Sequence, residues 1–225
     1  EDCTDIKNIK FGLPICEDIW EKTVLEKLSK SGAEIIIAIN ASPFTITKSF
    51  ERERVALSRV KETELPLIYL NRTGGQDELI FDGSSFALNH DGNKFFCSSE
   101  FKEEVSFINF EKQNEKWVGS GNLNKNTSEI ERLYKALVLG LRDYVNNNNF
   151  SGVVLGLSGG IDSALVAAIA TDAFGPEKVQ AIMLPSPFTG KESLNDAKDT
   201  ANFLKIKFSN LEINEAMKII DKTLG

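Results

Sequence analysis

The stretch VVLGLSGGIDSALVAAIA, residues 153–170, decides the fold of the second half of this chain. An apolar run leads into Ser158-Gly159-Gly160 and an alanine-rich segment follows, which predicts a strand, a tight turn and a helix. Glycines allow backbone N–H groups to approach an anion, and the positive end of a helix adds to the attraction. The stretch therefore predicts a phosphate-binding loop at residues 158–163, with a glycine turn that binds nothing as the alternative.

The residue sequence of this loop, SGGIDS, matches neither of two common nucleotide-binding motifs. The chain has no GxxxxGK[ST], the loop of the usual nucleoside triphosphatases, and no GxGxxG, the dinucleotide fingerprint. The two serine hydroxyls of the loop can donate to phosphate oxygens, and Asp162 can hold Mg²⁺ beside them.

Strands and helices alternate on both sides of the loop. A helix before it can be capped by Thr127 or Ser128 and ends at residues 146–149. We expect strands at 152–157, 179–184 and 206–211, and helices at 162–174, 192–204 and 215–223. This alternation is typical of right-handed crossovers in a parallel sheet.

The first half of the chain also mixes strands with helices. Strands are predicted at residues 32–40 and 66–71, with a helix at 48–64 between them. Asp91-Gly92 between two apolar runs indicates a hairpin. Residues 111–127 have few apolar side chains and several turn formers, so we interpret them as a linker. The expected domains are therefore 1–110 and 128–225.

The composition excludes several classes of function. The chain has 225 residues and a formal net charge of −7, which argues against a general nucleic-acid-binding surface. With His90 as its single histidine, a Ser-His-Asp triad is unlikely on composition and a multi-histidine metal site is impossible. Three irregularly spaced cysteines form no disulfide framework, and free thiols suggest a reducing compartment. No signal peptide is visible, and no apolar run reaches the roughly 18 residues of a membrane span.

Cys16 lies in a second informative stretch, ICEDIW at residues 15–20. The apolar residues before it predict a thiol at the end of a strand, ahead of a helix that begins near Glu21. A thiol that meets a helix N-terminus has a lowered pKa and becomes a better nucleophile. A buried structural cysteine is the alternative, and we interpret Cys3 and Cys97 in that way.

The SGGIDS loop resembles the pyrophosphate loop of the ATP pyrophosphatases, which activate an oxygen by adenylation. The segments LGLRDY at 139–144, AIMLPS at 181–186 and SLNDA at 193–197 resemble the NAD synthetases of that superfamily, although residues 188–190 depart from their serine-rich pattern. The resemblance implies that Met183 and Leu184 lie against the ATP adenine and that Asp162 is a ligand of Mg²⁺. It implies an ATP pyrophosphate site formed by Ser158, Gly159, Gly160, Ile161, Asp162 and Ser163.

ICEDIW resembles the nucleophile segment of the nitrilase-family amidases, and NASPF at 40–44 and GGQDELIFDGS at 74–84 agree with it. The resemblance implies that Cys16 attacks the carboxamide of glutamine. Glu17 and Ser42 then hold the amino and carboxylate ends of the substrate, and Lys48 pairs with the carboxylate.

The two resemblances occur in the order found in the glutamine-dependent NAD synthetases. That family implies the C-terminal part of a nitrilase-like αββα sandwich, followed by a Rossmann-like parallel-sheet ATP pyrophosphatase domain of the adenine nucleotide alpha hydrolase type. Glutamine hydrolysis supplies ammonia, and ATP with Mg²⁺ adenylates deamido-NAD, which is amidated to NAD with release of AMP and pyrophosphate. The family further implies a cytoplasmic homo-oligomer that binds neither nucleic acid nor a membrane.

The amidases of this family use a Glu–Lys–Cys triad, and residues 1–15 contain no Glu or Lys with a matching position. The synthetase segments that bind deamido-NAD are also missing. We therefore expect this chain to be part of a longer polypeptide, called the parent enzyme below. Two alternatives stay open: a non-catalytic fragment that binds nucleotide or serves assembly, and another ATP pyrophosphatase amidotransferase, such as a tRNA-modifying or GMP-forming enzyme.

Overall fold

The computed structural model describes residues 3–124 and 127–224, which fall into two compact units, Glu1–Ala136 and Leu137–Gly225. The predicted α/β class is confirmed in both units. The predicted domain limits remain a prediction, and residues 1, 2, 125, 126 and 225 lie outside the described part. No helix of the described residues is long and apolar enough to cross a membrane.

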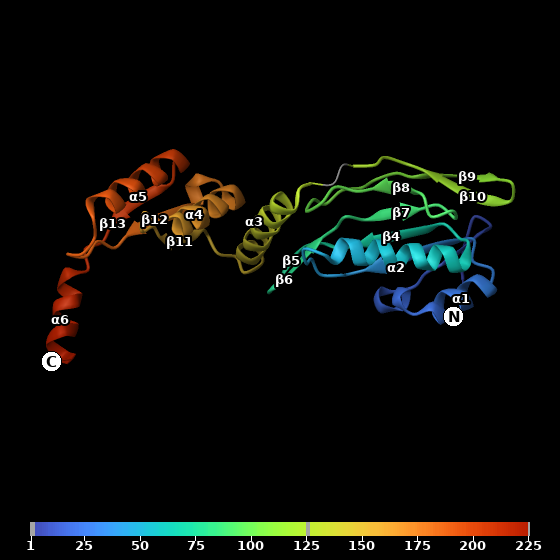
Figure 1. Ribbon diagram of the computed structural model, residues 1–225, viewed down its shortest axis with the longest axis horizontal. Coiled ribbons are helices and arrows are strands. Elements are labelled where there is room, and N and C mark those ends of the chain that lie inside the picture. The colour runs from blue at the N-terminus through green and yellow to red at the C-terminus, as the bar shows by residue number, and fades with distance from the viewer. Residues whose placement is uncertain (1–2, 125–126, 225) are drawn as a thin grey trace. The chain divides into compact units, whose positions relative to one another are not determined.

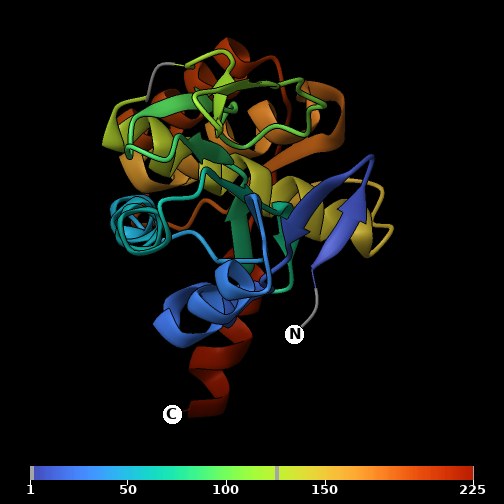
Figure 2. The same cartoon turned by 90° about the vertical axis from the view of Figure 1, so that its right-hand side faces the viewer.

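A six-stranded sheet organises the first unit, in the order β1-β2-β3-β4-β7-β8. The strands are β1 (Thr4–Ile6), β2 (Ile9–Gly12), β3 (Ile35–Asn40), β4 (Leu67–Asn71), β7 (Phe86–Leu88) and β8 (Lys94–Cys97). β2, β3 and β4 run parallel, β7 and β8 are added antiparallel, and β1 and β2 form the hairpin drawn as blue arrows in Figure 2. The predicted Asp91-Gly92 turn connects β7 to β8.

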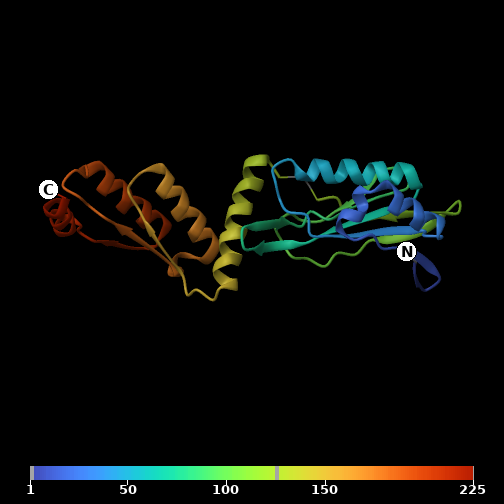
Figure 3. The same ribbon diagram turned by 90° about the horizontal axis from the view of Figure 1, so that it is seen from below.

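Two helices, α1 (Lys22–Lys30) and α2 (Lys48–Thr63), cover one face of this sheet (Figures 1 and 3). Leu25 and Leu28 of α1 and Ala56 and Val60 of α2 pack against alternate sheet residues such as Tyr69. The residues between those alternate ones point to the other face, because side chains alternate along a strand. The described residues therefore form one sheet and one helix layer of the expected αββα sandwich.

The segment interpreted as a linker contains a hairpin instead. Strands β9 (Asn109–Gln113) and β10 (Lys116–Ser120) pair antiparallel, and Phe110 packs edge-on against Phe95 of β8 with ring centroids 5.5 Å apart. The indole N–H of Trp117 donates to Glu34 at 3.2 Å. These few apolar contacts are enough to fold a polar segment onto the unit, so residues 109–120 are not a free linker. A further hairpin joins β5 (Thr73–Gln76) to β6 (Leu79–Asp82).

We expect Gly119→Ala to detach this hairpin. A Cβ at residue 119 would lie 2.2 Å from the buried ring of Phe95, and overpacking of this kind costs about 1–3 kcal/mol. Trypsin should then cleave at Lys112 and Lys116 about five- to hundred-fold faster, because cleavage follows the open population. The exposed neighbour Ser120 offers the control, and Ser120→Ala should leave the rate unchanged. Equal rates in the two variants would contradict the packed hairpin.

The second unit is a three-stranded parallel sheet with helices. Its strands are β11 (Val153–Gly156), β12 (Val179–Met183) and β13 (Lys207–Asn210), in that order. The helices α4 (Ile161–Phe174) and α5 (Lys191–Leu204) contribute Ala167, Ala170, Ala197 and Ala201 to its buried core, and lie together on the sheet in Figure 1. Small residues let these helices approach the strands closely. The predicted strand–helix alternation is confirmed here, with α3 (Glu129–Asn147) before it and α6 (Asn214–Leu224) after it.

Candidate active sites

Cys16 lies at a turn that the surrounding structure holds in an unusual conformation. Ile15 forms an isolated parallel bridge with Ile39, and its N–H donates to the Asp18 carboxylate at 2.9 Å. Cys16 follows with φ +51°, in the left-handed region that non-glycine residues seldom adopt. Such strain persists only where the neighbours fix it, and it is concentrated at functional sites.

The structure confirms the helix predicted to begin near Glu21 and corrects what the thiol meets. The thiol was expected ahead of a helix starting near Glu21. A 3₁₀ turn, η1 (Cys16–Trp20), comes first, and α1 begins only at Lys22. Cys16 therefore opens a short turn rather than meeting the N-terminus of α1.

A cavity of about 250 Å³ contains the thiol and the residues predicted to bind glutamine. They come from η1, from the loop after β3 and from the first residue of α2. Its lining residues are Cys16, Glu17, Trp20, Asn40, Ala41, Ser42, Pro43 and Lys48. All four predicted glutaminase residues thus lie in one place, while their roles remain predictions. Glu17 and Lys48 give the cavity one acidic and one basic group.

Lys48 reaches the cavity from the start of α2. Its Nζ lies 3.0 Å from the Glu51 carboxylate and 4.8 Å from the centre of the Trp20 ring. The hydrogen bond from Lys48 lowers the pKa of Glu51. Trp20 and Asn40 were not assigned a role from the sequence, although both lie within the quoted family segments.

The loop that carries Ser42 is held from behind by a buried arginine that sequence reasoning missed. Arg52 of α2 is 1% exposed and donates to the Ser42 hydroxyl at 3.0 Å and to the Ser42 and Pro43 carbonyls at 2.6 and 2.9 Å. Asn71 at the end of β4 accepts a hydrogen bond from the Ser42 N–H at 2.9 Å. Arg52 lies one helical turn after Lys48 on the same helix face, a spacing that could have singled it out.

The cavity lining contains no second glutamate and lysine that could complete the expected triad, as far as residues 3–124 and 127–224 are concerned. Lys7 and Lys10 belong to the β1–β2 hairpin and its turn, away from this lining. Among the described residues, this chain therefore brings a thiol, a carboxylate, an ammonium group and a hydroxyl together in one cavity.

The phosphate loop of the second unit is ordered by its own serines. The Ser163 hydroxyl accepts from the Ser158 N–H at 3.2 Å and donates to the Gly160 carbonyl at 2.9 Å. The Gly160 N–H donates to the Ser158 hydroxyl at 3.3 Å, and Gly160 is the N-cap of α4. Gly159 has φ +86°, and a Cβ there would lie 2.3 Å from the Ser193 carbonyl oxygen of α5. Only glycine fits at this point.

A cavity of about 420 Å³ opens beside the loop. Its lining residues are Gly156, Leu157, Ser158, Ile182, Met183, Leu184, Phe188, Thr189, Gly190 and Ser193. Met183 is 3% exposed and belongs to the core, while Leu184 is 47% exposed and freer to contact a base. Sequence reasoning assigned no role to Phe188 and Thr189, which lie in the stretch that departs from the family.

The remaining predicted loop residues are not among those that line this cavity. Gly159 and Gly160 form the turn, and Ile161, Asp162 and Ser163 form the first turn of α4. Asp162 is exposed. No group of three His, Cys, Asp or Glu side chains with metal-binding spacing occurs within the described part of the chain.

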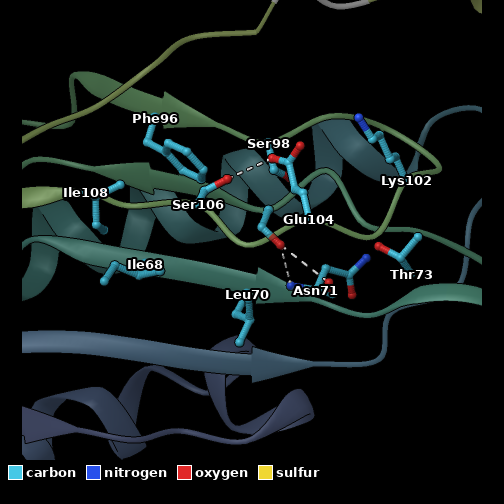
Figure 4. Close-up of a pocket in the computed structure, with 11 residues that line it drawn as sticks. Ile68, Leu70, Asn71, Thr73, Phe96, Ser98, Lys102, Glu104, Ser106 and Ile108 are labelled. Carbon is cyan, nitrogen blue, oxygen red and sulfur yellow. Dashed lines mark hydrogen bonds between the residues drawn. The ribbon is translucent and has the colours of Figure 1, made fainter.

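A third cavity, of about 190 Å³, lies in the first unit between β4 and the segment that follows β8 (Figure 4). Ile68, Leu70 and Phe96 line its apolar side. Its polar groups bond to one another: Ser106 donates to Glu104 at 2.9 Å, and the Asn71 N–H donates to Ser85 at 3.0 Å. No predicted site residue lies in this cavity.

Comparisons with known proteins identify the families of the two halves of the chain. Residues 2–114 match the carbon-nitrogen hydrolase family and residues 133–225 match the NAD synthase family. Over 96% of the chain, it is 42% identical to the glutamine-dependent NAD(+) synthetase of Acinetobacter baylyi and 43% identical to that of Rhodobacter capsulatus. The chain spans 40% of the length of each of these curated relatives.

A solved structure, the glutamine-dependent NAD(+) synthetase of Acinetobacter baumannii with adenosine diphosphate, covers 99% of the chain with a TM-score of 0.92 and 36% identity. The chain covers 42% of that protein. Because the hydrolase match alone spans half of its residues, this chain belongs to the carbon–nitrogen hydrolase family, with an NAD synthase domain following in the same polypeptide.

Proposed function

We propose that this chain supplies parts of both active sites of a glutamine-dependent NAD synthetase. The observation that carries the proposal is that Cys16, Glu17, Ser42 and Lys48 line one cavity, in a polypeptide that also holds the SGGIDS loop. A glutamine substrate has an ammonium group, a carboxylate and a carboxamide. The cavity offers the Glu17 carboxylate for the ammonium group, Lys48 with the Ser42 hydroxyl for the carboxylate, and the Cys16 thiol for the carboxamide.

In the first unit, the Cys16 thiolate attacks the carboxamide carbon of glutamine. A carbon–sulfur bond forms, the carbon–nitrogen bond breaks, and the proton given up by the thiol passes to the nitrogen, which leaves as ammonia. Water then attacks the γ-glutamyl thioester, releases glutamate and regenerates the thiol. The family assigns proton transfer to a glutamate and oxyanion stabilisation to a lysine, and we assign neither role to a described residue of this chain.

In the second unit, the N-terminus of α4 and the loop N–H groups other than those of Ser158 and Gly160, which bond within the loop, bind the β- and γ-phosphates of ATP. The carboxylate of deamido-NAD attacks the α-phosphorus and pyrophosphate leaves. Ammonia then displaces AMP from the acyl adenylate to give NAD. Leu184, with Met183 behind it, offers an apolar surface for the adenine at the edge of the cavity.

The donors present fit Mg²⁺, which binds through one or two carboxylates together with substrate phosphates and water. Asp162 is such a carboxylate, exposed on the first turn of α4 directly after the loop. Mg²⁺ would supply charge neutralisation for the departing pyrophosphate.

The proposal also includes a cytoplasmic homo-oligomer, and the exposed apolar residues Ile161, Leu165 and Val166 of α4 support a surface used in assembly.

The test is a reaction of the parent enzyme with glutamine, ATP, Mg²⁺ and deamido-NAD. We expect glutamate, NAD, AMP and pyrophosphate to form in equal amounts. ATP binding without turnover would favour the non-catalytic alternative. Turnover with xanthosine monophosphate or tRNA in place of deamido-NAD would favour another ATP pyrophosphatase.

A further inference from the structure

We propose that Arg52 is a positioning residue that makes Ser42 a hydrogen-bond donor toward the Cys16 cavity. Arg52 thereby determines that the α-carboxylate of the substrate binds beside Ser42 and Lys48, and the α-ammonium beside Glu17. This inference rests on the proposed glutaminase function. It adds a residue that does not line the cavity to the glutamine-binding groups that the family resemblance implies.

The first step concerns the direction of one hydrogen bond. A guanidinium has five N–H donors and no acceptor, so the Ser42 hydroxyl oxygen must accept from Arg52 Nε, which lies 3.0 Å away. A hydroxyl has only one hydrogen. Arg52 cannot accept this hydrogen. The buried Tyr69 hydroxyl also interacts with Ser42 and has no other hydrogen-bond partner within the described residues. Because Tyr69 can donate its own hydrogen to the Ser42 oxygen, the Ser42 hydrogen can be directed to a partner on the cavity side.

The second step concerns the backbone of the same loop. Arg52 Nη2 donates hydrogen bonds to the carbonyl oxygens of Ser42 and Pro43 at 2.6 and 2.9 Å, so both oxygens point toward helix α2. The Ser42 N–H is used by Asn71. What Ser42 offers a ligand is therefore its O–H donor, which matches an anion. Lys48 lies in the same cavity and adds a positive charge.

The third step concerns what holds the guanidinium in place. Asp82 at the end of β6 is fully buried and accepts from Arg52 Nη1 at 2.7 Å and from Asn71 Nδ2 at 3.4 Å. Its second oxygen lies 3.7 Å from Arg132 Nη2, and Arg132 Nε pairs with Glu100 at 2.6 Å. Burial raises the pKa of the Asp82 carboxyl, and the guanidinium of Arg52 acts in the opposite direction.

The two buried arginines allow positioning to be separated from stability. Arg52 and Arg132 both pair with Asp82, and both are less than a tenth exposed. Of these two arginines, Arg52 donates to Ser42, and Arg132 has no hydrogen bond with it within the described residues. Arg132→Met therefore removes a buried charge from the same carboxylate. The Arg132 guanidinium lies 5.5 Å from the centre of the Phe44 ring in the same loop, but in the described part of the chain it does not bond the Ser42 and Pro43 groups that Arg52 holds.

The experiment compares Arg52→Lys, Arg52→Met, Ser42→Ala and Arg132→Met in the parent enzyme. NAD formation is measured with glutamine, with free ammonium, and with 4-aminobutanamide, which is glutamine without its α-carboxylate. Lysine cannot reproduce the forked contacts of arginine. Loss of a hydrogen bond to a charged group is expected to raise KM for glutamine about ten- to hundred-fold in the Arg52 and Ser42 variants.

The ammonium-driven rate should stay unchanged in these variants, and kcat/KM for 4-aminobutanamide should fall much less than that for glutamine. Arg132→Met should leave KM for glutamine unchanged. An equal loss with both amides, or the same rise in KM for Arg132→Met, would overturn the positioning role. If Arg52→Met does not fold, which the loss of a thermal unfolding transition would reveal, Arg52→Lys and Ser42→Ala decide. A wild-type enzyme that does not use glutamine would instead refute the proposed function itself.

Discussion

Replacing Cys16 by alanine abolishes glutamine-driven NAD formation in the parent enzyme and leaves ammonium-driven formation intact. The thiol is the group that forms the covalent intermediate, and alanine offers no nucleophile in its place. Removal of a catalytic nucleophile typically lowers kcat by about a thousand-fold or more. The second unit shares no described residue with the Cys16 cavity, so its use of free ammonium should not depend on the thiol.

The other cysteines supply matched controls. Cys97 is 5% exposed, and burial raises the pKa of its thiol. Cys3 packs against the core of the first unit, and its thiol lies 3.5 Å from the Leu28 carbonyl oxygen. Cys3→Ala and Cys97→Ala should leave both reactions intact. Glutamine-driven activity that survives Cys16→Ala, or ammonium-driven activity that is lost with it, would contradict this division of labour.

The Cys16 cavity could be foreseen because it forms where parallel strands end. Cys16 follows β2, Ser42 follows β3 and Asn71 closes β4, and these three strands are neighbours in the sheet. Side chains at the carboxyl ends of neighbouring parallel strands meet at one edge. The strands themselves were readable because short β-branched runs alternate with helical stripes.

Other features depend on contacts that local patterns do not encode. The left-handed conformation of Cys16 is imposed by the bridge from Ile15 to Ile39, and cysteine itself has no preference for it. In the sequence, Arg52 looks like an ordinary exposed helix residue. It is buried because it pairs with Asp82, which is 30 residues away in the chain. The β9–β10 hairpin has few apolar residues, and Phe95 packs against it from another strand.

The same limit applies to the phosphate loop. The sequence predicts that the glycines form a turn. It does not show that residue 159 must be glycine because the Ser193 backbone of α5 lies against it.

We therefore expect Gly159→Ala to abolish NAD formation with glutamine and with ammonium alike. The new Cβ would meet the Ser193 carbonyl oxygen at 2.3 Å and its Cα at 2.8 Å, in a conformation with φ +86° that alanine disfavours. Backbone atoms on both sides cannot yield unless the loop or α5 moves.

The displaced loop no longer presents its N–H groups to the phosphates, so calorimetry should show ATP affinity reduced by about a hundred-fold or more, the equivalent of two hydrogen bonds to a charged group. Gly175 separates this clash from backbone strain alone: it has φ +78° at the end of α4, and a Cβ there would meet no atom within 4 Å. Gly175→Ala should therefore cost about 1–3 kcal/mol of stability, because φ +78° with ψ 159° is a conformation adopted almost only by glycine, and it should preserve ATP binding. Because the Cys16 cavity lies in the other unit, glutamine hydrolysis by Gly159→Ala should persist as glutamate release without NAD. Unchanged ATP affinity in Gly159→Ala would show that the loop does not hold the nucleotide, which would return the SGGIDS turn to a purely structural role.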